Sequence, residues 1–179
     1  MTLRAALLGF LADQPLSGYD LRKAFEASTG HFWSADQGQI YRTLQALEKE
    51  GCVTVETIEQ ASRPDRKPYH ITPRGVAELD TWLAAPARLA AERDPFLLQI
   101  FHAARLGPEA ATRLLHERIA QAERFAATLE ALAATLPPSG DLMLTLRRAT
   151  LDNGRAHLAC EIAWAQDLLT QLTPDDQSA

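Results

Sequence analysis

The sequence of 179 residues has little cysteine, and this shortage excludes two kinds of small stabilised protein. Its two cysteines, Cys52 and Cys160, are far apart, with no Cys-x-x-Cys pair or Cys/His cluster nearby. A disulfide framework and a structural zinc site are therefore excluded. We expect each cysteine to be a small buried hydrophobic side chain in a reducing, cytoplasmic compartment.

Long hydrophobic runs are also missing. No apolar stretch approaches the roughly 18 residues of a membrane-spanning helix. The apolar run near the N-terminus, within Met1–Ala12, leads directly into a capped helix and does not read as a signal peptide. The sequence therefore predicts a soluble protein without a membrane partner.

Catalytic signatures are absent as well. The sequence contains no H-E-x-x-H, P-loop, G-x-S-x-G or Rossmann fingerprint. Its five histidines show no metal-ligand spacing. We therefore expect no enzyme activity, no cofactor and no metal.

Positive charge is scarce overall but concentrated in one segment. The chain has 18 Lys and Arg against 23 Asp and Glu, a net charge of −5, which argues against nucleic acid as a partner. Between Gln60 and Gly75, however, the sequence has four basic residues and only one acidic residue, Asp65. The basic residues are Arg63, Arg66, Lys67 and Arg74. This local excess indicates either a DNA-binding footprint or an ordinary solvated loop.

What the sequence does contain is a series of helix signals in its first fifty residues. Leu3–Ala12 is apolar nearly all round, as in a buried helix. Ser17–Asp20 reads as a capping box, and the helix after it ends at Thr29, with Gly30 suited to the left-handed position. A second capping signature, Ser34–Gln37, precedes a helix that Gly51 closes. Its apolar stripe is formed by Ile40, Leu44 and Leu47, and the spacing of these helices is that of a helix-turn-helix.

The period then changes to that of strands. Val53–Ile58 alternates apolar and polar residues, and Pro68–Thr72 reads as a return strand after the basic loop. Thr72-Pro73 begins a further helix, which Pro86 stops. Residues 1–86 are therefore predicted to be a winged helix-turn-helix domain with three helices and a two-stranded wing.

Residues 87–179 contain only helix signals, so the whole protein is predicted to be mainly α. Helices are expected over Asp94–Arg105, Glu109–Leu136 and Asp141–Leu172, with a Pro-Pro-Ser-Gly turn between the last two. Apolar residues recur every seven positions in both long helices: Leu115, Ala122, Leu129 and Leu136 in one, and Leu151, Leu158, Ala165 and Leu172 in the other. We expect this hairpin to dimerise with that of a second copy, the alternative being that it packs on its own N-terminal half.

The second helix of a helix-turn-helix lies in the major groove, which assigns roles to its polar residues. Gln39 and Gln45 present paired donors and acceptors suited to adenine, and Arg42 suits guanine or a phosphate. Tyr41 offers its hydroxyl to a phosphate, unless it is a flanking core residue.

Further backbone contacts are expected outside that helix. Tyr19 lies in the first turn of the capped helix, where it is expected to contact a phosphate. The wing residues Arg63, Arg66 and Lys67 are expected to bind phosphate or to enter the minor groove.

Three runs together resemble the PadR family of transcriptional regulators: Gly18–Leu21, Gly38–Gly51 and Arg66–Gly75. The second half, which opens with Arg93–Leu98 and carries Trp164, is similar to the helical dimerisation domain of the longer PadR branch. The resemblance covers nearly the whole chain.

This resemblance implies a homodimeric winged-helix repressor of an adjacent operon, which binds an inverted repeat in double-stranded DNA. The family's recognition-helix residues correspond to Gln39, Tyr41 and Arg42, although many relatives carry proline where Arg42 stands, which implies an altered half-site preference. The basic residues of the wing also vary within the family.

The resemblance further implies release by a small aromatic or amphipathic effector. Phe96, Phe101 and Trp164 are candidates to line its pocket, between the domains or at the dimer seam, and dimer core is the alternative for all three. Two other functions stay open: a winged-helix protein-interaction module, and a transcriptional activator without a small-molecule ligand.

Overall fold

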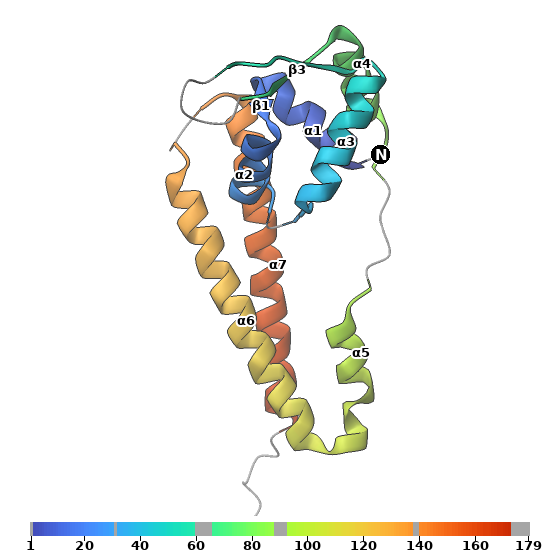
Figure 1. Ribbon diagram of the computed structural model, residues 1–179. Coiled ribbons are helices and arrows are strands. Elements are labelled where there is room, and N and C mark those ends of the chain that lie inside the picture. The colour runs from blue at the N-terminus through green and yellow to red at the C-terminus, as the bar shows by residue number, and fades with distance from the viewer. Residues whose placement is uncertain (1, 31, 60–65, 88–92, 138–139, 173–179) are drawn as a thin grey trace, which may run out of the picture. The chain divides into compact units, whose positions relative to one another are not determined.

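The computed structural model describes residues 2–30, 32–59, 66–87, 93–137 and 140–172, drawn as ribbon in Figure 1. The chain divides into two compact units, Met1–Leu89 and Ala90–Ala179. Each unit has its own apolar core.

Four helices build the first unit around one core. They are α1 (Thr2–Asp13), α2 (Gly18–Ser28), α3 (Gln37–Lys49) and α4 (Pro73–Ala84). The apolar stripe predicted for α3 is confirmed, because its residues are fully buried together with leucines of α1 and α2. These buried side chains are Leu7, Leu8, Leu21, Ile40, Leu44 and Leu47.

The wing is an antiparallel hairpin of β2 (Val53–Val55) and β3 (Pro68–Ile71), which confirms the two predicted strands. A third strand that was not predicted, β1 (Leu16–Ser17), pairs with the other edge of β3 and gives the order β1-β3-β2. Two residues are too few to show an alternating pattern, so the sequence did not predict this strand. The sheet thereby joins the wing to the N-terminus of α2.

The helix ends agree with the sequence in part. The capping box of Ser17 and Asp20 is confirmed, and Gly51, which was predicted to close α3, has a left-handed φ of +72°. The position predicted for Gly30 is wrong: its φ is not positive, and the helix ends on Thr29 in ordinary helical geometry. The cap of α3 is Asp36, two residues after Ser34: its carboxylate accepts from the Gln39 N–H at 2.9 Å, and the helix begins at Gln37.

An ion-pair network joins α1, the end of α3 and α4. The Arg4 guanidinium donates to the carboxylates of Glu50 and Glu78, each at 2.8 Å, and the Cys52 thiol donates to Glu78 at 3.3 Å. The hydrogen bond from Arg4 holds the pKa of Glu78 below its usual range. Glu50, Cys52 and Glu78 have the residue types of a metal site, but here a guanidinium supplies the positive charge.

The second unit is a helical hairpin with a short helix before it. After the Asp94 cap come α5 (Pro95–His102) and the 3-10 turn η1 (Ala103–Leu106), then α6 (Pro108–Thr135) and α7 (Leu142–Leu172). The single helix predicted over Asp94–Arg105 therefore tightens after His102. Gly107, with φ +87°, turns the chain into α6, which runs antiparallel to α7 (Figure 1).

The heptad residues pack α6 against α7 within one chain. Leu115, Ala122 and Leu129 of α6 and Leu151 and Ala165 of α7 are buried. Ion pairs join the same two helices, Arg118 to Glu161 at 2.6 Å and Arg155 to Glu130. The expectation that this seam serves to pair two copies is therefore not needed to explain its apolar pattern.

The two cysteines differ in their surroundings. Cys52 is buried, as expected, but Cys160 is exposed on α7, so the prediction of a buried residue there is wrong. In the described residues, no helix is long and apolar enough to cross a membrane.

Candidate nucleic-acid interface

Helix α3 turns a polar face away from the core. Gln39, Arg42 and Gln45 are exposed on it, while Ile40, Leu44 and Leu47 hold the opposite face in the core. The Asp36 cap fixes the first turn, so the backbone of Gln39 is tied in place while its side chain extends into solvent. Three side chains suited to base edges or phosphates therefore share one accessible surface.

Tyr41 lies at the flank of this surface against the N-terminus of α2. Gly18 is buried there, and a Cβ on it would stand 2.6 Å from Tyr41 Cε1 and 3.1 Å from its hydroxyl oxygen. The tyrosine is 37% exposed, so its ring packs on glycine backbone while one edge reaches solvent. Tyr41 therefore flanks the core and is still partly exposed to solvent.

Tyr19, the residue after Gly18, is exposed and surrounded by positive charge. The Lys23 ammonium lies 4.6 Å from the ring centroid and the Arg22 guanidinium 5.6 Å from it. Sequence reasoning selected Tyr19 but missed these two cations. An aromatic residue followed by basic residues three and four positions later on a helix is a signal that would have found them.

In the described part of the wing, one basic side chain contacts α2 and another is exposed to solvent. The hairpin continues beyond the strands through backbone bonds between Ile58 and Arg66, at 2.9 and 3.0 Å. Arg66 donates to Asp20 at 3.1 Å, and Lys67 is exposed. Arg63 lies outside the described residues.

The N-terminus of α2 is therefore where three predicted contact residues come together. Tyr41 packs on Gly18, Tyr19 follows it, and Arg66 binds Asp20 in the same turn. A hydrogen bond from the Ser17 hydroxyl, and after it the Arg66 guanidinium, hold the pKa of Asp20 below its usual range. Asp20 stays ionised near neutral pH and ties the wing to this helix end.

In the second unit, two of the three proposed effector residues touch. The rings of Phe96 and Trp164 meet edge to face with centroids 6.2 Å apart, and the Arg118 guanidinium lies 5.0 Å from the Phe96 centroid. Phe101 is 80% exposed and contacts His102 instead. Arg118, which sequence reasoning missed, links this cluster to Glu161.

A helix-turn-helix with an accessible polar face and an antiparallel wing defines a winged-helix DNA-binding protein. The chain matches the model of the transcriptional regulator PadR-like family over residues 7–81 and that of the virulence activator alpha C-terminal domain over residues 92–173. Residues 7–81 therefore form a PadR-like domain, as the sequence suggested, and the PadR-like family is one of transcriptional regulators and not of enzymes.

Individual relatives agree with this assignment. The chain is 45% identical to a probable transcriptional regulator of Mycobacterium tuberculosis over 86 residues, 48% of this chain and 46% of the relative, so it spans about half of that relative's length. It is 26% identical to the negative transcriptional regulator PadR of Bacillus subtilis, over 97% of this chain and 98% of the relative.

Solved structures extend the likeness to the whole fold. Bacillus subtilis PadR in complex with operator DNA superposes with a TM-score of 0.87 at 27% identity, covering 97% of this chain and all of that one. The same regulator in complex with p-coumaric acid gives 0.82 at 26% identity, covering 96% and 99%. The Vibrio cholerae virulence activator AphA gives 0.74 at 26% identity, covering 95% and 97%.

Proposed function

We propose that this regulator is a homodimeric repressor of an adjacent operon, which binds an inverted repeat and is released by a small aromatic or amphipathic effector. It then acts in the cytoplasm, with the DNA. The observation that carries the DNA-binding part is the meeting of α3, α2 and the wing at one helix N-terminus.

Each side chain at that place has a role in the proposal. Gln39, Gln45 and Arg42 contact base edges in the major groove, where amide and guanidinium groups form paired hydrogen bonds. Tyr41 and Tyr19 bind phosphates, and Arg63, Arg66 and Lys67 do so from the wing. The complex of Bacillus subtilis PadR with operator DNA supports the same use of this fold.

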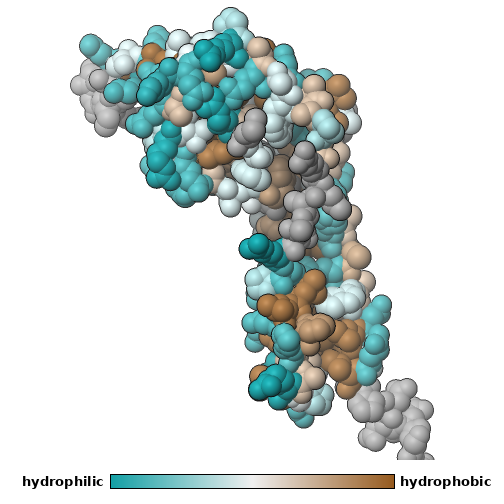
Figure 2. Space-filling model, turned by 90° about the vertical axis from the view of Figure 1, so that its right-hand side faces the viewer, coloured by the Kyte–Doolittle hydropathy of each residue, from teal (hydrophilic) through white to brown (hydrophobic). Residues whose placement is uncertain are grey.

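The proposal of a dimer is supported by apolar side chains of the second unit that are exposed to solvent. Figure 2 looks onto its α5 side, where hydrophobic side chains gather. Three residues of α5 are at least half exposed: Leu97, Leu98 and Phe101. On α7, Leu142 and Leu146 are also more than half exposed. Large apolar surface of this kind indicates a protein partner, and a second copy is the partner that an inverted repeat requires.

The effector part of the proposal assigns Phe96 and Trp164 to a ligand pocket, with Phe101 joining them only if a second copy covers it. The complex of Bacillus subtilis PadR with p-coumaric acid supports a small aromatic ligand. The activator alternative is favoured by the match of the second unit to a virulence activator domain and by the likeness to AphA. A reporter fused to the chain's own promoter separates the two, because deleting a repressor raises expression and deleting an activator lowers it.

Fluorescence anisotropy with DNA from upstream of the chain's own gene tests the proposal. We expect a preference of at least about 10³-fold over scrambled DNA at physiological salt, with two half-sites about one helical turn, roughly 34 Å, apart. Light scattering during gel filtration should give twice the 19.7 kDa chain mass. Equal affinity for scrambled DNA would contradict the proposal.

Two substitutions separate phosphate contacts from base contacts. Arg66→Ala should weaken binding to all sequences alike and reduce the slope of log affinity against log salt by about 0.9, the value for one phosphate. Gln39→Ala should leave the slope unchanged and relax the preference at one base position. Titrations of both variants across a salt series and a set of single-base operator variants make the measurement, with Arg124→Ala on α6 as the control. Identical behaviour of the two variants would show that this division of roles is wrong.

A further inference from the structure

A pocket in the second unit is lined by neither Phe96 nor Trp164. It opens between η1 and the first half of α6, with a cavity volume of about 470 Å³. This volume falls in the range of about 300–1,000 Å³ that is usual for small-molecule sites. Its apolar wall is formed by Ala103, Leu106, Ala110 and Leu114.

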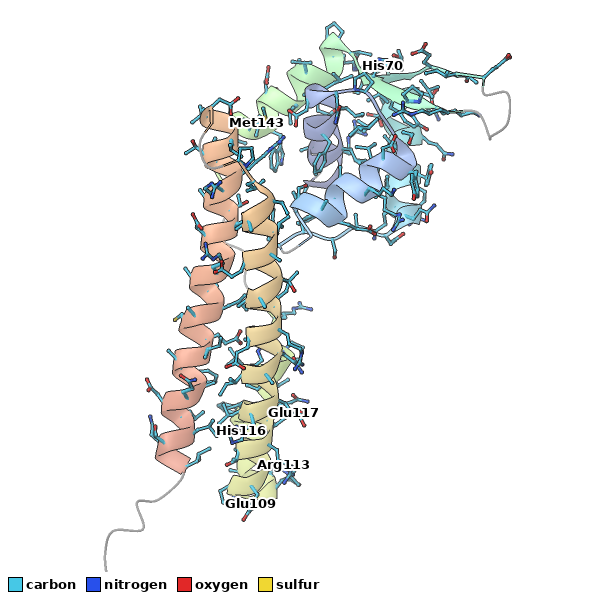
Figure 3. The ribbon with its side chains drawn as sticks, turned by 90° about the vertical axis from the view of Figure 1, so that its left-hand side faces the viewer. His70, Glu109, Arg113, His116, Glu117 and Met143 are labelled. Atoms are coloured by element: carbon cyan, nitrogen blue, oxygen red, sulfur yellow. The ribbon has the colours of Figure 1, made fainter. Side chains whose placement is uncertain are left out.

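Two arginines border this apolar wall. Arg105 from η1 and Arg113 from α6 line the pocket, and the acid that lines it with them is Glu117. Figure 3 labels Arg113 and Glu117 one turn apart on the same stretch of α6. Within the part of the chain that the structure describes, neither guanidinium takes part in an ion pair or hydrogen bond. Other arginines of this unit are used differently, since Arg118 and Arg155 each bind two acids.

We propose that this pocket binds a small organic carboxylate, whose apolar body lies on the wall and whose carboxylate is held by Arg105 and Arg113. Guanidinium groups match carboxylates with paired, charge-assisted hydrogen bonds. Apolar surface beside a few convergent polar groups is the usual composition of a ligand site. The inference rests on the proposed function and revises its effector part, because it places the ligand in this pocket and not at Phe96 and Trp164.

The location also suits a regulator. The pocket joins η1, the irregular turn between α5 and α6, to the side of α6. A ligand that contacts both walls holds the short helix α5 against the hairpin. Ligand binding would therefore act on the helix that carries the exposed Leu97, Leu98 and Phe101, which are assigned above to the dimer surface.

Isothermal titration calorimetry of the full chain with p-coumarate and with its uncharged methyl ester tests the inference. We expect the acid to bind and the ester to bind at least about tenfold more weakly, because the ester cannot accept charge-assisted hydrogen bonds in the same way. Arg105→Glu and Arg113→Glu should each weaken binding of the acid by at least about tenfold. Arg113→Lys, which keeps the charge but loses the fork, should weaken it less.

The matched control is Arg124→Glu, the same change on an exposed arginine of α6 outside the pocket. It should leave p-coumarate binding unchanged. Three results would overturn the inference: binding that the two pocket variants leave unchanged, no binding of p-coumarate to the wild-type chain, or loss of the dimer in the pocket variants during gel filtration. The last result would show that a second copy covers this surface.

Operator binding of the ligand-free variants distinguishes this inference from the proposed function. If wild type and pocket variants bind operator DNA equally but p-coumarate binds elsewhere or not at all, the pocket assignment fails and the DNA-binding function stands. If none of them prefers operator DNA, the proposed function fails whatever the calorimetry shows.

Discussion

Gly75→Ala should destabilise the first unit by about 3 kcal/mol, a large effect for the addition of one methyl group. A Cβ at Gly75 would stand 2.2 Å from the Cys52 carbonyl oxygen and 2.8 Å from Ile71 Cγ1. Distances this short require a movement of the backbone, because the closest atom is a main-chain oxygen that no rotamer change can displace.

The Cys52 carbonyl oxygen already accepts a hydrogen bond. The Cys52 carbonyl accepts from the Thr72 N–H at 3.0 Å, while the Thr72 hydroxyl accepts from the Gly75 N–H at 3.2 Å and caps α4. Moving the backbone at Cys52 therefore disturbs the hydrogen bond that joins the residue before β2 to the cap of α4. Urea unfolding followed by circular dichroism measures the loss of free energy, and the melting temperature should fall by roughly 10–20 °C.

Gly9→Ala is the matched control. Gly9 lies inside α1, and a Cβ there meets nothing within 4 Å. Alanine is the better helix former by about 0.8–1 kcal/mol, so this variant should be as stable as the wild type or more stable. If Gly75→Ala unfolds within about 0.5 kcal/mol of the wild type, the close approach of Cys52 and α4 is wrong.

The large features of this fold were predictable because they repeat. The stripe of Ile40, Leu44 and Leu47 and the seven-residue spacing through Leu115, Ala122 and Leu129 are periodic, and buried positions follow from such periods. The spacing of apolar residues does not say which surface the apolar face packs against. The seam of α6 packs on α7 of its own chain, and the same pattern would suit a second copy equally well.

Contacts made between distant segments were not predictable from local signals. Arg66 was selected for its charge, but its bond to Asp20 joins residues 46 positions apart. Arg4, Glu50 and Glu78 form a network that spans 74 positions, and no local spacing marks it. Strand β1 forms because β3 passes beside Leu16, and two residues carry no pattern of their own. The residues of the candidate site could therefore be selected from the sequence, but their meeting point at the N-terminus of α2 could not.

Gly18→Ala should retain the fold and lower operator affinity by about tenfold, close to the free energy of one hydrogen bond to a charged group. The Cβ would stand 2.6 Å from Tyr41 Cε1, but here the obstacle is the far end of a partly exposed side chain, which can turn into solvent. The ring would move and carry the hydroxyl away from the phosphate that we assign to it. Because a tyrosine is uncharged, the salt dependence of binding should not change. Anisotropy titrations with operator DNA measure the loss.

A double-mutant cycle separates displacement of Tyr41 from other effects of the substitution. Tyr41→Ala removes the ring, so adding Gly18→Ala should then cause no further loss of affinity beyond about 0.3–0.5 kcal/mol. Tyr41→Phe should reproduce the loss seen for Gly18→Ala, because it removes the hydroxyl and keeps the ring. If the losses for Gly18→Ala and Tyr41→Ala add in the double variant, Gly18 does not act by positioning Tyr41. Urea unfolding of Gly18→Ala provides the check on the fold, since a destabilisation as large as that expected for Gly75→Ala would attribute the loss to unfolding instead.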